Sequence, residues 1–267
     1  MSNPLIVIPA RMGSTRFPGK PLAEIAGISM LRRTVDVARQ VQKADYVVAT
    51  DSVDIQSHCQ SFEIPVVMTS PDIQSGSDRT LAALDTVNSD ADIVVNLQGD
   101  APFTNPCHVK AVINGLSESD ADIATPYIQL DWAALDILRN SKKETPFSGT
   151  TLIENGGRAI WFSKNIIPAI RDELAMREAS PLSPVCRHIG LYAFRRDALK
   201  RYTTLPVSPY EKFEGLEQLR ALENGMSIAA IKVLAPHISS PGIDTPQDLV
   251  RAEELIAEFG DSFKGAL

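Results

Sequence analysis

The first 125 residues of this 267-residue chain alternate short apolar runs, rich in β-branched residues, with longer segments of helical periodicity. The runs predict strands at residues 5–8, 46–49, 65–68 and 93–97. The intervening segments predict helices near residues 30–42, 53–62, 79–88 and 108–116. Spacings of roughly 20 to 40 residues between the runs suit a strand, a crossover helix and a second strand. This order constrains the chain to an α/β fold with a mostly parallel sheet.

The pattern changes after about residue 125. Two apolar segments, 151–154 and 158–162, flank Asn155-Gly156-Gly157, which favours a β-hairpin and predicts an antiparallel insertion. Segment 175–184 is aperiodic and contains two prolines, so we expect an exposed loop. The α/β pattern resumes with a strand, a helix, a strand and a last helix at 189–194, 210–223, 228–233 and 246–259.

We predict a single domain whose parts span about 1–125, 126–207 (the insertion) and 208–267. The chain carries 26 Lys and Arg against 33 Asp and Glu, a net charge of −7, which argues against a nucleic-acid surface or a polybasic membrane face. No stretch resembles a signal peptide or the roughly 20 apolar residues of a membrane span, so we expect a cytoplasmic protein. The scattered cysteines Cys59, Cys107 and Cys186 indicate neither disulfides nor a zinc site.

Positive charge is concentrated directly after the first predicted strand. Residues 1–23 contain Arg11, Arg16 and Lys20 and no acidic residue. Open α/β sheets bind ligands at such strand-to-loop junctions, where backbone N–H groups can approach phosphates. The segment is not a Walker A motif, because its glycine spacing is one residue too long and Pro21 occupies the position of the magnesium-binding hydroxyl. No G-x-G-x-x-G motif is present either. We interpret the segment as an anion-binding loop, with a solvated basic loop as the alternative.

Two aspartates are candidates for a metal site. Asp100 follows the apolar run 93–97, where it either ligates a metal or caps a turn. Asp244 precedes the last helix, but Thr245 and Asp248 already make a capping-box-like start there, so Asp244 is not needed as the cap. Because Mg²⁺ is bound by one or two carboxylates plus substrate phosphates, the pair predicts a magnesium site.

A polar loop, 69–79, enters the third predicted helix. Ser77 or Asp78 would serve as its N-cap, and the local sequence leaves a capping role and a ligand-binding role equally open.

Five segments in one order carry a family resemblance. They are the basic loop, Gln98-Gly99-Asp100, Arg187-His188-Ile189-Gly190-Leu191-Tyr192-Ala193-Phe194-Arg195, Leu216-Glu217-Gln218-Leu219-Arg220 and Ile243-Asp244-Thr245-Pro246. Together they closely resemble the 3-deoxy-manno-octulosonate (Kdo) cytidylyltransferases over nearly the whole chain. The resemblance implies a Rossmann-like three-layer αβα nucleotidyltransferase fold with a hairpin insertion, and a homodimer. It also implies transfer of CMP from CTP to Kdo for lipopolysaccharide biosynthesis.

The resemblance implies roles for individual residues. The groups expected to act in catalysis are Arg11, Lys20 and Asp100. Those expected to hold CTP are Arg11, Ser14, Arg16, Lys20, Gln74, Ser75, Gly76, Arg79 and Gln98. Those expected to hold the sugar are Arg187, His188, Glu214 and Gln218. Mg²⁺ would be held by Asp100 and Asp244.

Departures from the family pattern lie near the expected sugar site. Ala101 stands where the family carries a glutamate, Thr150 where a lysine is usual, and Lys164 where an arginine is common. A lysine does not reproduce the bidentate contacts of an arginine. We therefore expect the acceptor to be Kdo or its 8-amino analogue. His188 has a structural alternative as a buried, hydrogen-bonded histidine, but its neighbour Arg187 favours a sugar-acid site.

Two other functions stay open at this point. One is a cytidylyltransferase for another 2-keto sugar acid of the sialic acid type. The other is a non-catalytic, CTP-binding regulatory module. Intact Arg11, Lys20, Asp100 and Asp244 favour an enzyme, although the sequence identifies no general base.

Overall fold

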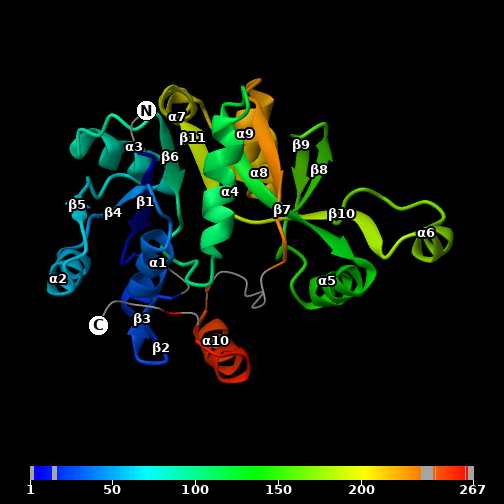
Figure 1. Ribbon diagram of the computed structural model, residues 1–267, viewed down its shortest axis with the longest axis horizontal. Coiled ribbons are helices and arrows are strands. Elements are labelled where there is room, and N and C mark those ends of the chain that lie inside the picture. The colour runs from blue at the N-terminus through cyan, green and yellow to red at the C-terminus, as the bar shows by residue number, and fades with distance from the viewer. Residues whose placement is uncertain (1–2, 14–16, 236–242, 244, 262, 264–267) are drawn as a thin grey trace.

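The computed structural model describes residues 3–13, 17–235, 243, 245–261 and 263. Within them one sheet has the strand order β10-β8-β9-β12-β7-β11-β6-β1-β4-β5, and two short strands pair separately (Figure 1). The strands are β1 (Leu5–Ala10), β2 (Glu24–Ile25), β3 (Ile28–Ser29), β4 (Asp45–Thr50), β5 (Val66–Met68), β6 (Ile93–Asn96), β7 (Ile123–Asp131), β8 (Thr151–Asn155), β9 (Arg158–Ser163), β10 (Leu182–His188), β11 (Tyr192–Arg195) and β12 (Ile228–Lys232).

Helices cover both faces of the sheet (Figure 1). They are α1 (Met30–Arg39), α2 (Val53–Ser61), α3 (Gly76–Thr86), α4 (Pro106–Ser117), α5 (Trp132–Glu144), α6 (Glu173–Ala179), α7 (Arg196–Thr204), α8 (Pro209–Glu214), α9 (Glu217–Glu223) and α10 (Pro246–Phe259), with a 3₁₀ turn at Lys20–Leu22. No helix in the described part of the chain is long and apolar enough to cross a membrane.

The predicted three-layer α/β fold is confirmed. Strands β6, β1, β4 and β5 pair in parallel. Along β1, Leu5 and Val7 belong to the core that includes α3 and α7, whereas Ile6 and Ile8 belong to the core that includes α1, α2 and α4. This alternation buries both faces of the strand, which explains its continuous apolar run. The predicted hairpin is also present as β8 and β9, which pair antiparallel.

Strand β7 was missed because it contains a proline. Pro126 lies where β7 changes its neighbour on one side, since Ala124 pairs with β11 and Tyr127 pairs with β10. At this junction the missing N–H interrupts no continuous ladder, and the Pro126 carbonyl still accepts a hydrogen bond from the Ile189 N–H at 3.1 Å.

The expected loop at 175–184 is wrong, although most of the segment is exposed as predicted. The segment ends α6 and begins β10. Pro184 lies at a register shift of β10, where a missing N–H is tolerated, and the Ser183 hydroxyl donates to the Leu130 carbonyl at 2.8 Å. The expected helix at 210–223 is instead two helices, because Gly215 adopts a left-handed conformation with φ of 63° between α8 and α9.

Candidate functional site

The ends of β1 and β6 meet at one edge of the sheet. A Cβ atom on Gly99 would lie 2.8 Å from the Pro9 carbonyl oxygen, so the close approach of the two chains requires glycine there. The residue after this contact, Asp100, is therefore held beside the loop that follows β1. Sequence patterning predicted this meeting of strand ends.

An ion pair joins the basic loop to Asp100. The Lys20 Nζ lies 2.7 Å from the Asp100 Oδ2, and the lysine side chain is only 10% exposed. Gly19, with φ of 74°, turns the chain into the 3₁₀ helix, and its N–H donates to the Met12 carbonyl at 3.3 Å. The loop thus places a buried cation against the carboxylate. Ser14 and Arg16 lie outside the described residues.

A cavity of about 340 Å³, here named the loop cavity, opens beside this ion pair. Its lining includes the predicted nucleotide-binding residues that the structure describes. They are Arg11, Lys20, Gln74, Ser75, Gly76, Arg79 and Gln98. The N-terminus of α3 also lies at this cavity, and free N–H groups at a helix start favour an anion.

The N-cap of α3 is Ser75, not Ser77 or Asp78. The Ser75 hydroxyl accepts the Asp78 N–H at 3.0 Å and donates to the Asp78 carboxylate at 2.6 Å. Ser77 instead donates to the Glu217 carboxylate at 3.2 Å. The capping role and the position in the cavity wall therefore coincide in Ser75.

Arg79 lines the loop cavity with its guanidinium already engaged. Its nitrogens donate to the Asp51 carboxylate at 2.8 Å, the Thr69 hydroxyl at 2.5 Å and the Ile73 carbonyl at 2.9 Å. These bonds fix the loop that leads to Ser75 against the end of β4. Arg79 shapes the wall of the cavity by holding that loop.

A second cavity of about 440 Å³, here named the hairpin cavity, adjoins the first. Arg187, His188 and Gln218, three of the predicted sugar-binding residues, line it. Thr150 and Lys164 at the open end of the hairpin line it as well. Burial lowers the pKa of the Arg187 guanidinium, and a partly desolvated cation favours an anionic partner.

His188 is a buried neutral imidazole. Its Nε2 lies 2.8 Å from the Thr125 hydroxyl, which itself donates to the Leu191 carbonyl at 2.8 Å. The hydroxyl proton is thereby used, so Nε2 carries the imidazole proton and Nδ1 is an acceptor. Burial, and to a smaller extent the charge of Lys164, lower the pKa of His188 to about 3. His188 is thus a hydrogen-bonded, buried histidine that also lines the hairpin cavity.

Gln218 presents an unpaired donor. The side chain is 6% exposed and lines the hairpin cavity, and its Nε2 has no hydrogen-bond partner in the described chain. A buried unsatisfied amide typically costs about 1–3 kcal/mol. A ligand oxygen in the cavity would remove this cost, so the residue is suited to bind a hydroxyl or carboxylate.

Glu214, predicted to hold the sugar, is not part of the described lining of either cavity. Its carboxylate accepts the Ser163 hydroxyl and the Lys164 N–H, both at 2.8 Å. Glu214 therefore stabilises the chain at the end of β9, next to Lys164, which lines the hairpin cavity.

Glu217 was missed in the sequence although it lies in the Leu216–Arg220 motif. Together with Gln98 and Asp100, it lines both cavities. Burial raises the pKa of its carboxyl, against the opposing effects of the Ser77 hydrogen bond and the Arg220 charge. The signal available beforehand was its position next to Gln218.

Asp244 lies outside the described residues. Ile243 is described, and its N–H donates to the Asp100 carbonyl at 3.2 Å, so the chain before Asp244 passes beside Asp100. Thr245 and Asp248 form the expected capping box of α10. Among the described residues no three His, Cys, Asp or Glu side chains cluster as a metal site.

An α/β fold with a basic loop and two adjoining cavities at the ends of its strands suits a nucleotidyltransferase. The family model for cytidylyltransferases matches residues 5–228, and the chain belongs to this family. A 3-deoxy-manno-octulosonate cytidylyltransferase from Maricaulis maris (strain MCS10) is 43% identical over 96% of this chain and 98% of its own length. Its counterpart from Chelativorans sp. (strain BNC1) is 39% identical over 97% of this chain and 98% of its own length.

Solved structures agree with this assignment. The structure of CMP:2-keto-3-deoxy-manno-octonic acid synthetase complexed with CTP is 34% identical, with a TM-score of 0.82 over 96% of this chain and 99% of its own. A cytidylyltransferase from Leptospira borgpetersenii, 17% identical with a TM-score of 0.60 over 98% and 91%, shares the fold.

Proposed function

We propose that this enzyme transfers CMP from CTP to the anomeric hydroxyl of Kdo, for lipopolysaccharide biosynthesis. The observation that carries the proposal is the junction of the two cavities, where Gln98, Asp100 and Glu217 line both. CTP would occupy the loop cavity, with its triphosphate toward Arg11 and Lys20. The sugar acid would occupy the hairpin cavity, so that its reacting oxygen meets the α-phosphate at the junction.

Nucleotidyl transfer depends mainly on the positioning of the two substrates and on neutralisation of the phosphate charge. The anomeric oxygen bonds to the α-phosphorus, the bond from this phosphorus to the bridging oxygen breaks, and pyrophosphate leaves with the electron pair. Lys20 and Arg11 offset the charge of the leaving group. We assign the proton of the anomeric hydroxyl to Glu217, because its raised pKa and its place at the junction suit a general base.

Mg²⁺ fits this site as a proposed cofactor. The Asp100 carboxylate is 33% exposed at the junction, and Ile243 brings the chain that carries Asp244 to the Asp100 backbone. Carboxylates plus phosphates are the oxygen ligands that Mg²⁺ takes. When bound, the ion would neutralise phosphate charge. Removal of divalent ions with EDTA should abolish turnover, and added Mg²⁺ should restore it.

The 8-amino analogue of Kdo is a second candidate substrate. Ala101, Thr150 and Lys164, the three departures from the family pattern, all line the hairpin cavity. Changes confined to this wall support an altered sugar preference and leave the CTP wall intact. Competition between Kdo and the analogue for one enzyme decides between them, and a preference for ordinary Kdo would exclude the analogue as the main substrate.

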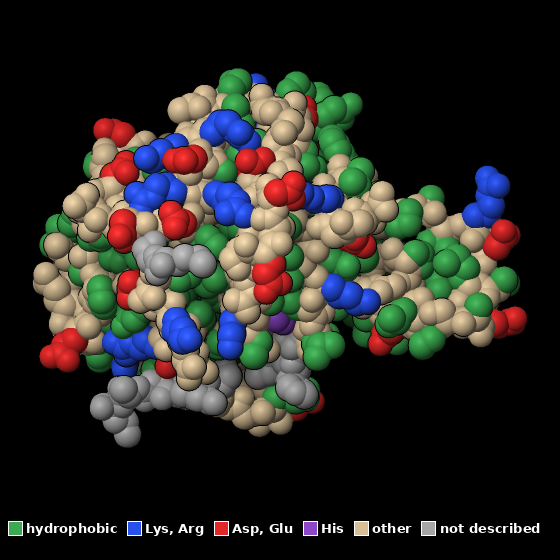
Figure 2. All heavy atoms as spheres, turned by 45° about the horizontal axis from the view of Figure 1, so that its top comes forward, with side chains coloured by type: hydrophobic (Ala, Val, Ile, Leu, Met, Phe, Trp, Pro, Cys, Tyr) green, Lys and Arg blue, Asp and Glu red, His purple; other side chains and the backbone are tan. Residues whose placement is uncertain are grey.

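We also propose a homodimer, with a cytoplasmic location as expected from the sequence. Figure 1 shows α5, α6 and part of β10 as an arm that projects from the sheet, and Figure 2 shows hydrophobic side chains on its surface. Helix α6 buries no residue, and Leu174 is 81% exposed. A second copy covering this arm would remove apolar surface from water. Sedimentation equilibrium of wild type and Leu174→Glu tests this, and a wild-type monomer would refute it.

The direct test of the function is pyrophosphate release from CTP and Mg²⁺ with Kdo, its 8-amino analogue or sialic acid. Turnover with either octulosonate supports the proposal. Turnover with sialic acid alone would favour the other sugar-acid reading, and CTP binding without turnover would favour a regulatory module.

A further inference from the structure

The ammonium group of Lys142 in α5 lies in a cradle of backbone carbonyls. Its Nζ donates to the carbonyl oxygens of Ser148 at 2.5 Å, Lys164 at 2.6 Å and Gly149 at 2.8 Å, with a longer contact to Pro146 at 3.3 Å. An ammonium has three N–H donors, so the three short bonds use them all. Charge-assisted bonds of this kind are stronger than neutral ones.

These carbonyls belong to the two segments, one before β8 and one after β9, that form the open end of the hairpin. Gly149 precedes β8 by two residues and Lys164 follows β9 directly. Both residues line the hairpin cavity, as does Thr150 between Gly149 and β8. Lys142 itself is not part of the described cavity lining, so its effect on a bound sugar would pass through the backbone that it holds.

The backbone of Lys164 is held by hydrogen bonds at both its carbonyl and its N–H. Its carbonyl accepts the Lys142 ammonium at 2.6 Å, and its N–H donates to the Glu214 carboxylate at 2.8 Å. Burial and the charges of Lys164 and Arg187 lower the pKa of Lys142, whereas Glu214 raises it. Lys142 and Glu214 thus act as an oppositely charged pair that fixes the backbone from which the Lys164 side chain reaches the cavity.

We propose that Lys142 is a positioning residue for sugar recognition, which clamps the open end of the hairpin and so sets the place of Thr150 and Lys164 in the cavity wall. The inference rests on the proposed function of the hairpin cavity. The contacts of Lys142 include none of the described residues that line only the loop cavity. Its loss should therefore weaken sugar binding and leave CTP binding intact.

The test compares Lys142→Met with Lys143→Met. Lys143 is the neighbouring exposed lysine, and its Nζ donates to the Asn140 side-chain oxygen at 2.9 Å. Steady-state kinetics are measured by pyrophosphate release. The KM of Lys142→Met for Kdo should rise roughly tenfold, and its KM for CTP should stay within about twofold of wild type. Both KM values of Lys143→Met should be unchanged. Because Lys142 acts partly through Lys164, the effect of the double variant with Lys164→Met should be smaller than the product of the two single effects.

A folded Lys142→Met enzyme with both KM values unchanged, or with both raised equally, would overturn the proposal. If this variant does not fold, Lys142→Gln, whose amide keeps two donors, and Glu214→Gln are judged by the same criterion. A wild-type enzyme inactive with CTP and every sugar would instead overturn the proposed function, and the sugar role of Lys142 with it.

Discussion

The two cavities are built by different means. The loop cavity is walled by short segments at the ends of parallel strands, and its charges are paired within the chain, as in Lys20 with Asp100 and Arg79 with Asp51. The hairpin cavity shares the segment after β6 but adds side chains from antiparallel strands and from α9, and it retains the unpaired amide of Gln218. Close backbone contacts and paired charges suit the binding of CTP, which all members of the family share. The wall of the hairpin cavity consists more of separate side chains, so single substitutions can change its preference for a sugar.

The largest effect is expected where the cavities meet. Asp100→Asn should lower kcat by about 10³-fold or more, because it removes the carboxylate proposed to hold Mg²⁺ beside the α-phosphate. Pyrophosphate release measures the loss, and thermal unfolding checks that the fold is intact. Near-normal turnover in a folded variant would show that the junction is not the reaction centre.

Glu217→Gln should lower kcat by roughly 10²-fold, because an amide cannot take the proton from the sugar hydroxyl. The pH profile of kcat should also lose its acidic limb, which reports the raised pKa of Glu217. A variant that changes only KM would show that Glu217 binds substrate without acting as a base.

Gln218→Leu separates binding from stability. The substitution removes a buried donor without a partner, so the free energy of unfolding should change by less than about 1 kcal/mol. The KM for the sugar should nevertheless rise roughly tenfold, because the ligand loses that donor. Denaturant unfolding and steady-state kinetics on one preparation test both parts. A strongly destabilised protein with a normal KM would contradict this role.

The buried imidazole of His188 should make stability fall in acid. Its folded pKa of about 3 lies below the ordinary 6.5, so the unfolded chain takes up a proton first as pH falls below 6.5. Between pH 7 and pH 5 this costs about 2 kcal/mol of stability. Denaturant unfolding of wild type and His188→Gln at pH 7 and pH 5 isolates the contribution of His188, since His58 and His108 are present in both proteins. Equal pH dependence would contradict a neutral buried His188.

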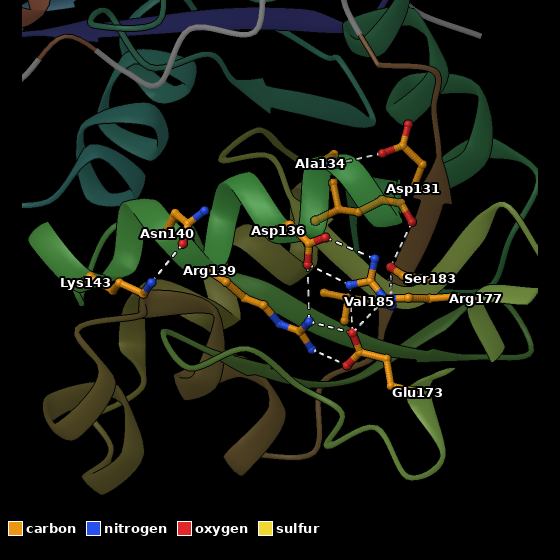
Figure 3. A network of polar contacts seen from close by, with 11 residues as sticks. Asp131, Ala134, Asp136, Arg139, Asn140, Lys143, Glu173, Arg177, Ser183 and Val185 are labelled. Atoms are coloured by element: carbon orange, nitrogen blue, oxygen red, sulfur yellow. Dashed lines mark hydrogen bonds and ion pairs between the residues drawn. The ribbon is translucent and has the colours of Figure 1, made fainter. Parts of the chain in front are cut away.

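The smallest effect concerns the arm. Glu173 binds Arg139 and Arg177, and Asp136 binds Arg177, which ties α6 to α5 (Figure 3). The two arginines lower the pKa of Glu173 to about 2, so this contribution is complete above 4.5 and lost as pH falls towards 2. At neutral pH, Glu173→Gln should speed hydrogen exchange across α6.

The exposed Glu178 provides the control, because Glu178→Gln keeps those ion pairs. KM for CTP should stay unchanged in both variants. An α6 that exchanges equally fast in wild type and Glu173→Gln would show that the network does not hold the arm.

The loop side of the molecule could be predicted well, because β1, α1 and β6 follow local periodicity and the motifs lie at strand ends. Ser75 and Glu217 show the limits, since a cap is chosen by backbone geometry and a cavity position by distant packing. On the hairpin side, Pro126 and Pro184 broke the strand pattern, and only the change of strand neighbours and the register shift in three dimensions explain their presence in β7 and β10. The place of Glu214 outside the sugar wall likewise depends on contacts with β9.

A crystal structure of the Asp100→Asn enzyme with CTP and Kdo tests the central claim directly. The two-cavity arrangement predicts the triphosphate beside Arg11 and Lys20, the sugar against Arg187 and Gln218, and the anomeric oxygen facing the α-phosphate between residue 100 and Glu217. Density for the sugar outside the hairpin cavity, or for CTP outside the loop cavity, would contradict it.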